Sequence, residues 1–316
     1  MGAKGLKHRL QGFTLIELSI VLVIIGLIVG GVLVGRDLLA AAAVRAQISQ
    51  IEKYQQAVNT FKGKYGYLPG DIPNPIAGQF GFQTRGLLAG QGDGNGVLET
   101  TFGGTSHLFQ GEEGMFWVDL SHANLIDGSF TTATPSGVFS GNGPTGSAIG
   151  NYLPQSKIGS SGYVYVWSGG WQSFAGQPDS INYFAISGVT GSGWSVPLMT
   201  VAQAYAIDKK MDDGLPQFGN VLAMDTGMFW ASGGPTTGCS VPCENNWGDF
   251  AFIPSSSGGI SYAPVSPSAN SATYDDQNGA TASQTCYSNG DTMAVEQYSV
   301  VNNAHYVNCV LSFKFQ

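Results

Sequence analysis

Charged side chains are scarce in this chain of 316 residues, and histidine and cysteine number only four each. Asp, Glu, Lys and Arg make up 11% of the residues, less than half of the usual share of about 25%. With 13 basic against 21 acidic residues, the net charge is −8. Binding to a phosphate backbone needs clustered Lys and Arg, so we expect no nucleic-acid partner.

Catalytic motifs are also lacking. The sequence contains no Gly-x-Ser-x-Gly elbow, no His-Glu-x-x-His pair and no Gly-x-x-x-x-Gly-Lys phosphate loop. None of the four histidines has a recognisable nucleophile–base spacing. Adjacent carboxylates such as Glu112 and Glu113 point apart on a regular helix or strand, so they do not predict an acid/base pair. The sequence therefore predicts that the protein is not an enzyme.

Glycine, with 46 residues, and apolar residues, with 43%, are abundant instead. The apolar share is sufficient for a core and excludes wholesale disorder. Charge is unevenly placed: Lys4, Lys7 and Arg9 are basic, whereas the chain from Gly66 onward carries five basic and 18 acidic residues, a net charge of −13.

A long apolar run follows the basic start. Phe13 to Val34 is 22 residues with one charge, Glu17, and as a helix it would span about 33 Å, enough for a hydrocarbon core of roughly 30 Å. The preceding basic residues predict a cytoplasmic start by the positive-inside rule, and everything after Arg36 should then lie outside.

The segment from Lys4 to Val34 has a specific order of features. A basic leader ends in Gly12, Phe13-Thr14-Leu15-Ile16-Glu17 follows, and 17 uncharged residues complete the run. This segment resembles the type IV pilin and type II secretion pseudopilin family. The resemblance implies that prepilin peptidase cuts after Gly12 and methylates the new amine of Phe13. It also implies insertion in the inner membrane, a periplasmic head, an assembly platform as partner, and polymerisation with like or related pilin subunits into a filament that can reach the cell surface.

Glu17 has two interpretations. It can be the fourth residue of a capping box, Thr14-Leu15-Ile16-Glu17, helped by the helix dipole. Alternatively, because an ionisable group in an apolar span is costly and implies a partner, it can form an assembly salt bridge with the Phe13 amine of a neighbouring subunit. The leader, Gly12 and Phe13 all favour the second interpretation.

Beyond the run, apolar residues fall on one face of a helix. Val44, Ile48, Ile51 and Val58 are spaced i, i+4, i+7 and i+14, which favours packing against a sheet over a coiled coil. The helix should extend from about Phe13 to Lys62. We expect a leader at 1–12, a membrane and filament-core helix at 13–35, an amphipathic half at 36–64 and a β-rich extracytoplasmic head at 65–316.

Strand signals dominate the head. Tyr163–Trp167 and Ile181–Ile186 are rich in β-branched and aromatic residues, and Val307 to Phe315 alternates as a half-buried strand does. Short helices are expected over Met115–Ile126 and Leu198–Met211. The predicted fold is α+β and pilin-like, with a long N-terminal helix packed on a β-rich, disulfide-containing head.

The cysteines are predicted to lie outside the membrane, where disulfides persist. Cys239 and Cys243 could close a local loop, and Cys286 with Cys309 would tie the last strand to the head. Four cysteines allow three connectivities. The resemblance favours the local-plus-terminal pairing, because pilin heads often carry a disulfide near the C-terminus.

Two acidic segments could hold a metal. Asp93, Asn95 and Glu99 place oxygen ligands at spacings 1, 3 and 7, which suits calcium, although Asp-Gly and Asn-Gly are also typical of a plain hairpin turn. Asp208, Asp212 and Asp213 form a similar group, for which a solvated helix end is the favoured interpretation.

The sequence thus predicts a structural subunit of a type IV pilus or a type II secretion pseudopilus. The alternative is a minor or tip subunit whose large head binds a surface or a secreted partner. The head, at about 250 residues, is larger than the resemblance implies for a major subunit, which favours this alternative. Glu17 argues against the capping pseudopilin, which lacks that glutamate in the family.

Overall fold

The computed structural model describes most of the chain up to residue 225 and parts of the remainder. Residues 15–88, 90–99, 107–135, 143–159, 161–168, 181–189, 195–196, 198–216, 219–225 and 307–316 are described, with short pieces at 253–254, 260–261, 286–288, 297–298 and 300. The chain divides into two compact units, Met1–Ala43 and Val44–Gln316. Cys239 and Cys243 lie outside the described residues.

Helix α1 (Leu15–Tyr65) has 51 residues, a length of about 77 Å. Within the second unit its buried side chains lie on one face of the helix: Val44, Gln47, Gln50, Ile51, Tyr54, Ala57, Val58 and Phe61. The expected packing face is confirmed at Val44, Ile51 and Val58, whereas Ile48 is only half buried. The helix ends where Gly66 adopts a φ of +81° and its N–H bonds to the carbonyl of Lys62 at 2.8 Å.

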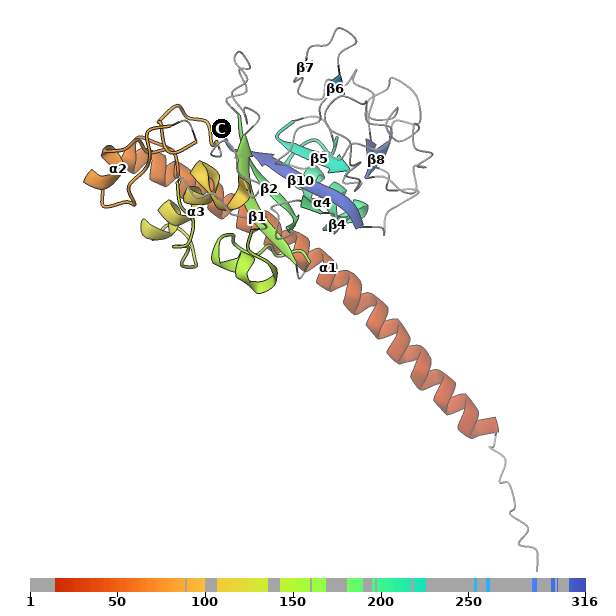
Figure 1. Ribbon diagram of the computed structural model, residues 1–316. Coiled ribbons are helices and arrows are strands. Elements are labelled where there is room, and N and C mark those ends of the chain that lie inside the picture. The colour runs from red at the N-terminus through yellow and green to blue at the C-terminus, as the bar shows by residue number, and fades with distance from the viewer. Residues whose placement is uncertain are drawn as a thin grey trace, which may run out of the picture. The chain divides into compact units, whose positions relative to one another are not determined.

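An antiparallel sheet of six strands forms the centre of the head (Figure 1). Strand β2 (Asn182–Val189) pairs with β1 (Gly162–Ser168), with β3 (Ser195–Val196) and with β10 (Val307–Lys314). Strand β10 also pairs with β4 (Met199–Thr200) and β5 (Val221–Asp225). Because β10 lies between β2 and β5, the C-terminal strand is internal to the sheet.

Two-residue strands and short helices complete the described elements. Two small antiparallel pairs are β6 with β7 and β8 with β9. Their bounds, with those of the short helices, are α2 (Ile76–Gln79), η1 (His107–Phe109), η2 (Gly146–Asn151), β6 (Ile253–Pro254), β7 (Ile260–Ser261), β8 (Tyr287–Ser288) and β9 (Gln297–Tyr298).

Aromatic rings build the core between α1, the sheet and α3 (Gly111–His122). Phe184 of β2 lies within 6.1 Å, centroid to centroid, of Tyr54 on α1, Phe116 on α3 and Phe315. Phe116 and Phe184 have no exposed surface. Helices α1 and α3 therefore pack on the same face of the sheet, which confirms the predicted helix-on-sheet arrangement.

The three expected strands are present, but β10 differs from its predicted environment. Alternation predicted a half-buried strand, yet Cys309 to Phe313 are all buried, including Val310 and Ser312. Both faces of β10 are therefore covered, whereas an antiparallel sheet commonly leaves one face to solvent. The prediction of a half-buried strand was therefore wrong.

Both short helices exist with shifted bounds. Helix α3 begins at Gly111 and ends at His122, in each case four residues before the predicted Met115 and Ile126. Helix α4 (Val201–Met211) ends as predicted, but Leu198 to Thr200 precede it and include β4. Thr200 caps α4: its hydroxyl accepts from the Gln203 N–H and the Gln203 side chain accepts from the Thr200 N–H, a capping box.

Candidate functional site

The loop of residues 91–99, which we call the Asp93 loop, contains the predicted calcium ligands. The described residues 90–99 contain bends and no strand, so the hairpin alternative is wrong. Within the loop, the Asp93 carboxylate accepts from the backbone N–H of Asn95 at 3.0 Å, and the Asn95 side-chain oxygen accepts from the N–H of Val97 at 2.7 Å. These local bonds shape successive turns.

Two carboxylates from outside the loop fix its backbone. Asp71, which follows α1 in the chain, accepts from the N–H groups of Gly94 at 2.7 Å and Gly96 at 2.9 Å. Glu112, in the first turn of α3, accepts from Gly92 at 2.7 Å, from Asp93 at 3.3 Å and from Glu99 at 2.9 Å. The loop is thus held by carboxylates rather than by strand pairing.

The glycines of the loop are required for this arrangement. Gly92, Gly94 and Gly96 have φ between +79° and +89°, a region that favours glycine. A Cβ on Gly92 would lie 2.5 Å from the carbonyl oxygen of Ile72. The loop therefore approaches the segment that follows α1 (residues 66–75, the connector after α1) too closely for any residue other than glycine at this position.

Burial and mutual repulsion act on the carboxylates of this region. Desolvation is the largest cause that raises the pKa of Asp71, to about 7, against the lowering effect of its backbone donors. Desolvation and the charges of Asp71 and Asp93 raise the pKa of Glu112 well above its usual value. Burial likewise raises the pKa of Glu113, and the charge of Glu99 adds to it.

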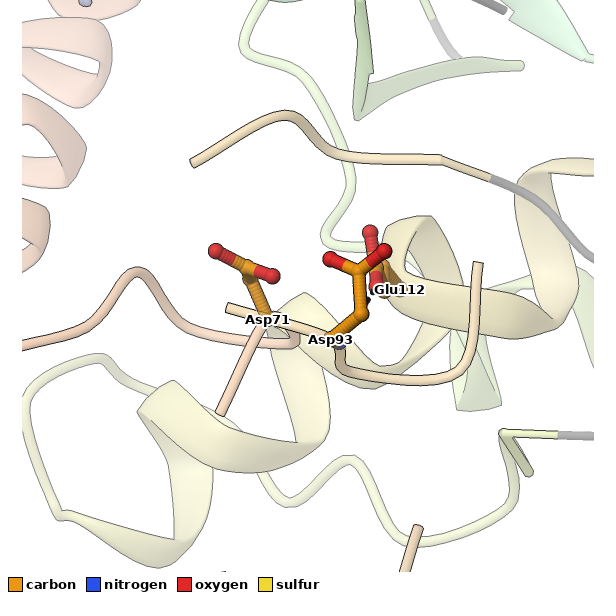
Figure 2. Close-up of side chains that lie close together, drawn as sticks. All are labelled: Asp71, Asp93 and Glu112. Atoms are coloured by element: carbon orange, nitrogen blue, oxygen red, sulfur yellow. Dashed lines mark hydrogen bonds between the residues drawn. The ribbon is translucent and has the colours of Figure 1, made fainter. Parts of the chain in front are cut away.

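The structure brings together one predicted ligand and two unpredicted ones. Carboxylate oxygens of Asp71, Asp93 and Glu112 lie within 4.8 Å of one another, from three separate segments (Figure 2). Asn95 and Glu99 belong to the same loop: the Asn95 amide donates to the Asp93 carboxylate at 3.2 Å, and burial together with the charge of Asp93 raises the pKa of Glu99. Sequence reasoning missed Asp71 and Glu112, because nothing local indicates that a residue 22 positions before Asp93 accepts from its loop.

A buried ion pair lies beside the loop. Arg85 bonds to Asp119 of α3, and Asp119 also accepts from the N–H of Gly70 at 2.7 Å. The side chains of Arg85 and Asp119 are 0% and 1% exposed. Through Gly70, Asp119 links α3 to the connector after α1. The charge of Arg85 is already compensated by Asp119.

The second acidic group lies at the end of α4. Asp208 accepts from the N–H of Gly214 at 3.1 Å and from the Tyr298 hydroxyl at 2.8 Å. Asp212 accepts from the N–H groups of Asn220 and Val221. Because Asp208 is fully buried, the expectation of a solvated helix end is wrong for it, and these carboxylates instead hold the turn between α4 and β5.

The disulfide expected near the C-terminus is present. Cys286 and Cys309 are bonded, with Cα atoms 5.2 Å apart, and they are 23 positions apart in sequence. Cys309 is on β10 and both residues are fully buried. The bond therefore ties the segment around β8 to the internal strand of the sheet.

The first unit presents apolar side chains to its surroundings. Every Leu, Ile and Val from Leu15 to Leu39 is between 50% and 89% exposed. This part of α1 is long enough and apolar enough to cross a membrane. Glu17 lies in its first turn, whereas Gly12, Phe13 and Thr14 lie outside the described residues. An exposed apolar surface of this extent indicates burial in a membrane or against other chains.

Comparison with known proteins supports one family for this N-terminal segment. Residues 7–33 match the family model described as the prokaryotic N-terminal methylation motif. No curated protein and no solved structure matches the chain. The motif indicates a type IV pilin-like substrate of prepilin peptidase and assembly with pilin-type subunits, and it does not separate pilins from pseudopilins.

Proposed function

We propose that this chain is a structural, non-catalytic subunit of a type IV pilus or type II secretion pseudopilus. Prepilin peptidase would remove residues 1–12 and methylate Phe13 at the inner membrane. The mature chain would then leave the membrane through the assembly platform and polymerise with like or related subunits. The observation that carries the proposal is the methylation motif on a helix whose apolar residues are exposed on every side.

Glu17 is assigned the central role in assembly. In a filament core of low dielectric, its carboxylate would pair with the Phe13 amine of a neighbouring subunit. A carboxylate in an apolar span costs a few kcal/mol on insertion scales. Replacing Glu17 with Leu should therefore ease membrane insertion and yet prevent extraction into filaments, since removing one member of a buried pair typically costs about 3–5 kcal/mol.

The test compares the filament yield in the sheared fraction for wild type and variants that are present in the membrane in equal amounts. Glu17→Leu and Glu17→Gln should both be cleaved after Gly12 and both fail to assemble. The matched control is Glu52→Gln, an exposed acid in the amphipathic half of the same helix, which should assemble as wild type does. Normal assembly of Glu17→Gln would show that Glu17 is only a helix start and would remove the salt-bridge assignment.

The second candidate function is a minor or tip subunit whose head binds a surface or a secreted partner. The head of about 250 residues favours it. The copy number per sheared filament separates the two candidates. Thousands of copies would exclude the tip position, and one or a few would exclude the role of major subunit.

A further inference from the structure

Five carboxylates lie in or next to the Asp93 loop, and in the described part of the chain none of them is paired with a basic side chain. They are Asp71, Asp93, Glu99, Glu112 and Glu113. The charged groups that act on Asp71, Glu99, Glu112 and Glu113 are all acidic. The side chain of Arg85 reaches this loop, but its guanidinium is paired with Asp119. Among the described residues, no basic side chain is ion-paired with these five carboxylates.

The spacing of the oxygens suits one calcium ion. Calcium binds oxygens at 2.3–2.6 Å, so two ligands of one ion lie at most about 5 Å apart. The oxygens of Asp71, Asp93 and Glu112 meet this limit, because they lie within 4.8 Å of one another (Figure 2). The ligand set favours calcium over magnesium, because three protein carboxylates meet there, whereas magnesium usually keeps several waters and binds through one or two carboxylates.

Lone pairs remain on these carboxylates after their backbone bonds are counted. An ionised carboxylate has about four acceptor positions. Asp71 accepts one N–H on each oxygen, and Asp93 accepts one bond from Asn95 on each oxygen. Glu112 accepts two N–H groups on Oε1 and one on Oε2, which leaves one position on Oε2. The backbone bonds that hold the loop are therefore compatible with a cation on the same carboxylates.

Glu113 supplies an independent observation. Its side chain is 2% exposed, and its Oε2 has no hydrogen-bond donor. Glu113 directly follows the ligand Glu112 in the first turn of α3, and the backbone N–H of Glu99 bonds to the Glu112 carboxylate at 2.9 Å. The Oε2 of Glu99 is also buried without a donor. A buried polar atom without a partner is costly, and a cation within this group would compensate both glutamates.

We propose that the Asp93 loop and the first turn of α3 form a calcium site. Asp71, Asp93 and Glu112 are its ligands, and Glu99 and Glu113 complete its negative charge. The positive end of α3, equivalent to about half an elementary charge, opposes a cation far less than five carboxylates attract it. The ion would join the connector after α1, the Asp93 loop and α3. The proposal does not depend on filament assembly.

The full-length mature chain in detergent, first stripped with EDTA, provides the test. Equilibrium dialysis with radioactive calcium at neutral pH should show one site, with a dissociation constant on the order of 10⁻⁴ M as in extracellular modules. Thermal unfolding should shift upward by about 3 °C or more in ~10 mM calcium. Magnesium at the same concentration should have a smaller effect.

Two variants and one control identify the site. Asp93→Asn, at an exposed position, should weaken calcium binding at least tenfold with little change of melting temperature in EDTA. Glu113→Gln should melt in EDTA at or above the wild-type temperature, which shows that it folds, and should lose most of the calcium-dependent shift. The matched control is Asp213→Asn, an exposed acid of the second acidic group whose carboxylate accepts from Leu215. It should bind calcium as wild type does.

Three outcomes would overturn the proposal. One is a melting temperature that is equal in calcium and in EDTA, which would mean that protons neutralise the buried carboxylates. The second is an equal shift with magnesium. The third is wild-type calcium affinity in both Asp93→Asn and Glu113→Gln, which would place any bound calcium elsewhere.

Discussion

The two halves of α1 differ both in apolar content and in environment. Up to Leu39 its large apolar side chains are all at least half exposed, whereas in the second unit Ile51 and Phe61 have no exposed surface. The difference follows from the pattern: apolar residues lie all around the first half and on one face of the second. A one-sided helix finds its partner within its own chain, while an all-round apolar helix requires a membrane or other subunits.

The largest expected effect comes from blocking the removal of the leader, residues 1–12, which precedes the first half of α1. Gly12→Val should leave a full-length precursor in the inner membrane, because in the proposed processing the peptidase cuts after a residue without a side chain. Intact-mass measurement should show that wild type begins at Phe13 with the added mass of one methyl group. The head of the variant should melt as wild type does. A mature wild-type chain that begins elsewhere would contradict the assignment of the leader.

The core of the second unit should be far more sensitive than the exposed surface of the first. Phe184→Ala removes a ring that packs on Tyr54, Phe116 and Phe315, and should destabilise the head by about 3–5 kcal/mol. Leu27→Ala, at a side chain 73% exposed, is the matched truncation and should leave head stability unchanged. Denaturant unfolding of the full chain in detergent measures both. An equal loss in the two variants would contradict the separation into two units.

The disulfide should stabilise the head and have no effect on the first unit. Replacing Cys286 and Cys309 together with Ser should cost about 3 kcal/mol, because the bond closes a loop of 23 positions and restricts the unfolded chain. Membrane insertion should be unchanged. Free thiols at both positions in non-reduced periplasmic material would show that the bond does not form in the cell.

Local patterns predicted the elements better than they predicted contacts between them. The long helix, the strands at 162–168 and 182–189 and the terminal strand all follow from periodicity and residue type. The burial of β10 on both faces did not, because alternation reports one covered face and the neighbours of a strand depend on topology. Similarly, the buried Gln47 bonds to the N–H of Lys157 at 2.7 Å, a contact across 110 positions that no local signal indicates.

The acidic site shows the same limit. Asp93, Asn95 and Glu99 were recognisable because their spacing is local. Asp71 and Glu112 take part only because the connector and α3 fold against the loop, and the adjacent pair Glu112 and Glu113 was expected only to point apart. Both are instead buried, which becomes evident only when the packing of α3 is known.

The smallest expected effect tests whether local helix signals within the head contribute to its stability. Thr200→Ala removes the side chain that accepts from the N–H of Gln203 and should destabilise the head by about 1 kcal/mol. Thr60→Ala is the matched control, because the Thr60 hydroxyl bonds back to the carbonyl of Gln56 within α1, a bond that slightly destabilises helices. It should be neutral or stabilising. Urea unfolding of the two variants decides the point: equal stability of Thr200→Ala and wild type would mean that β4 and β10 hold the start of α4 without its cap.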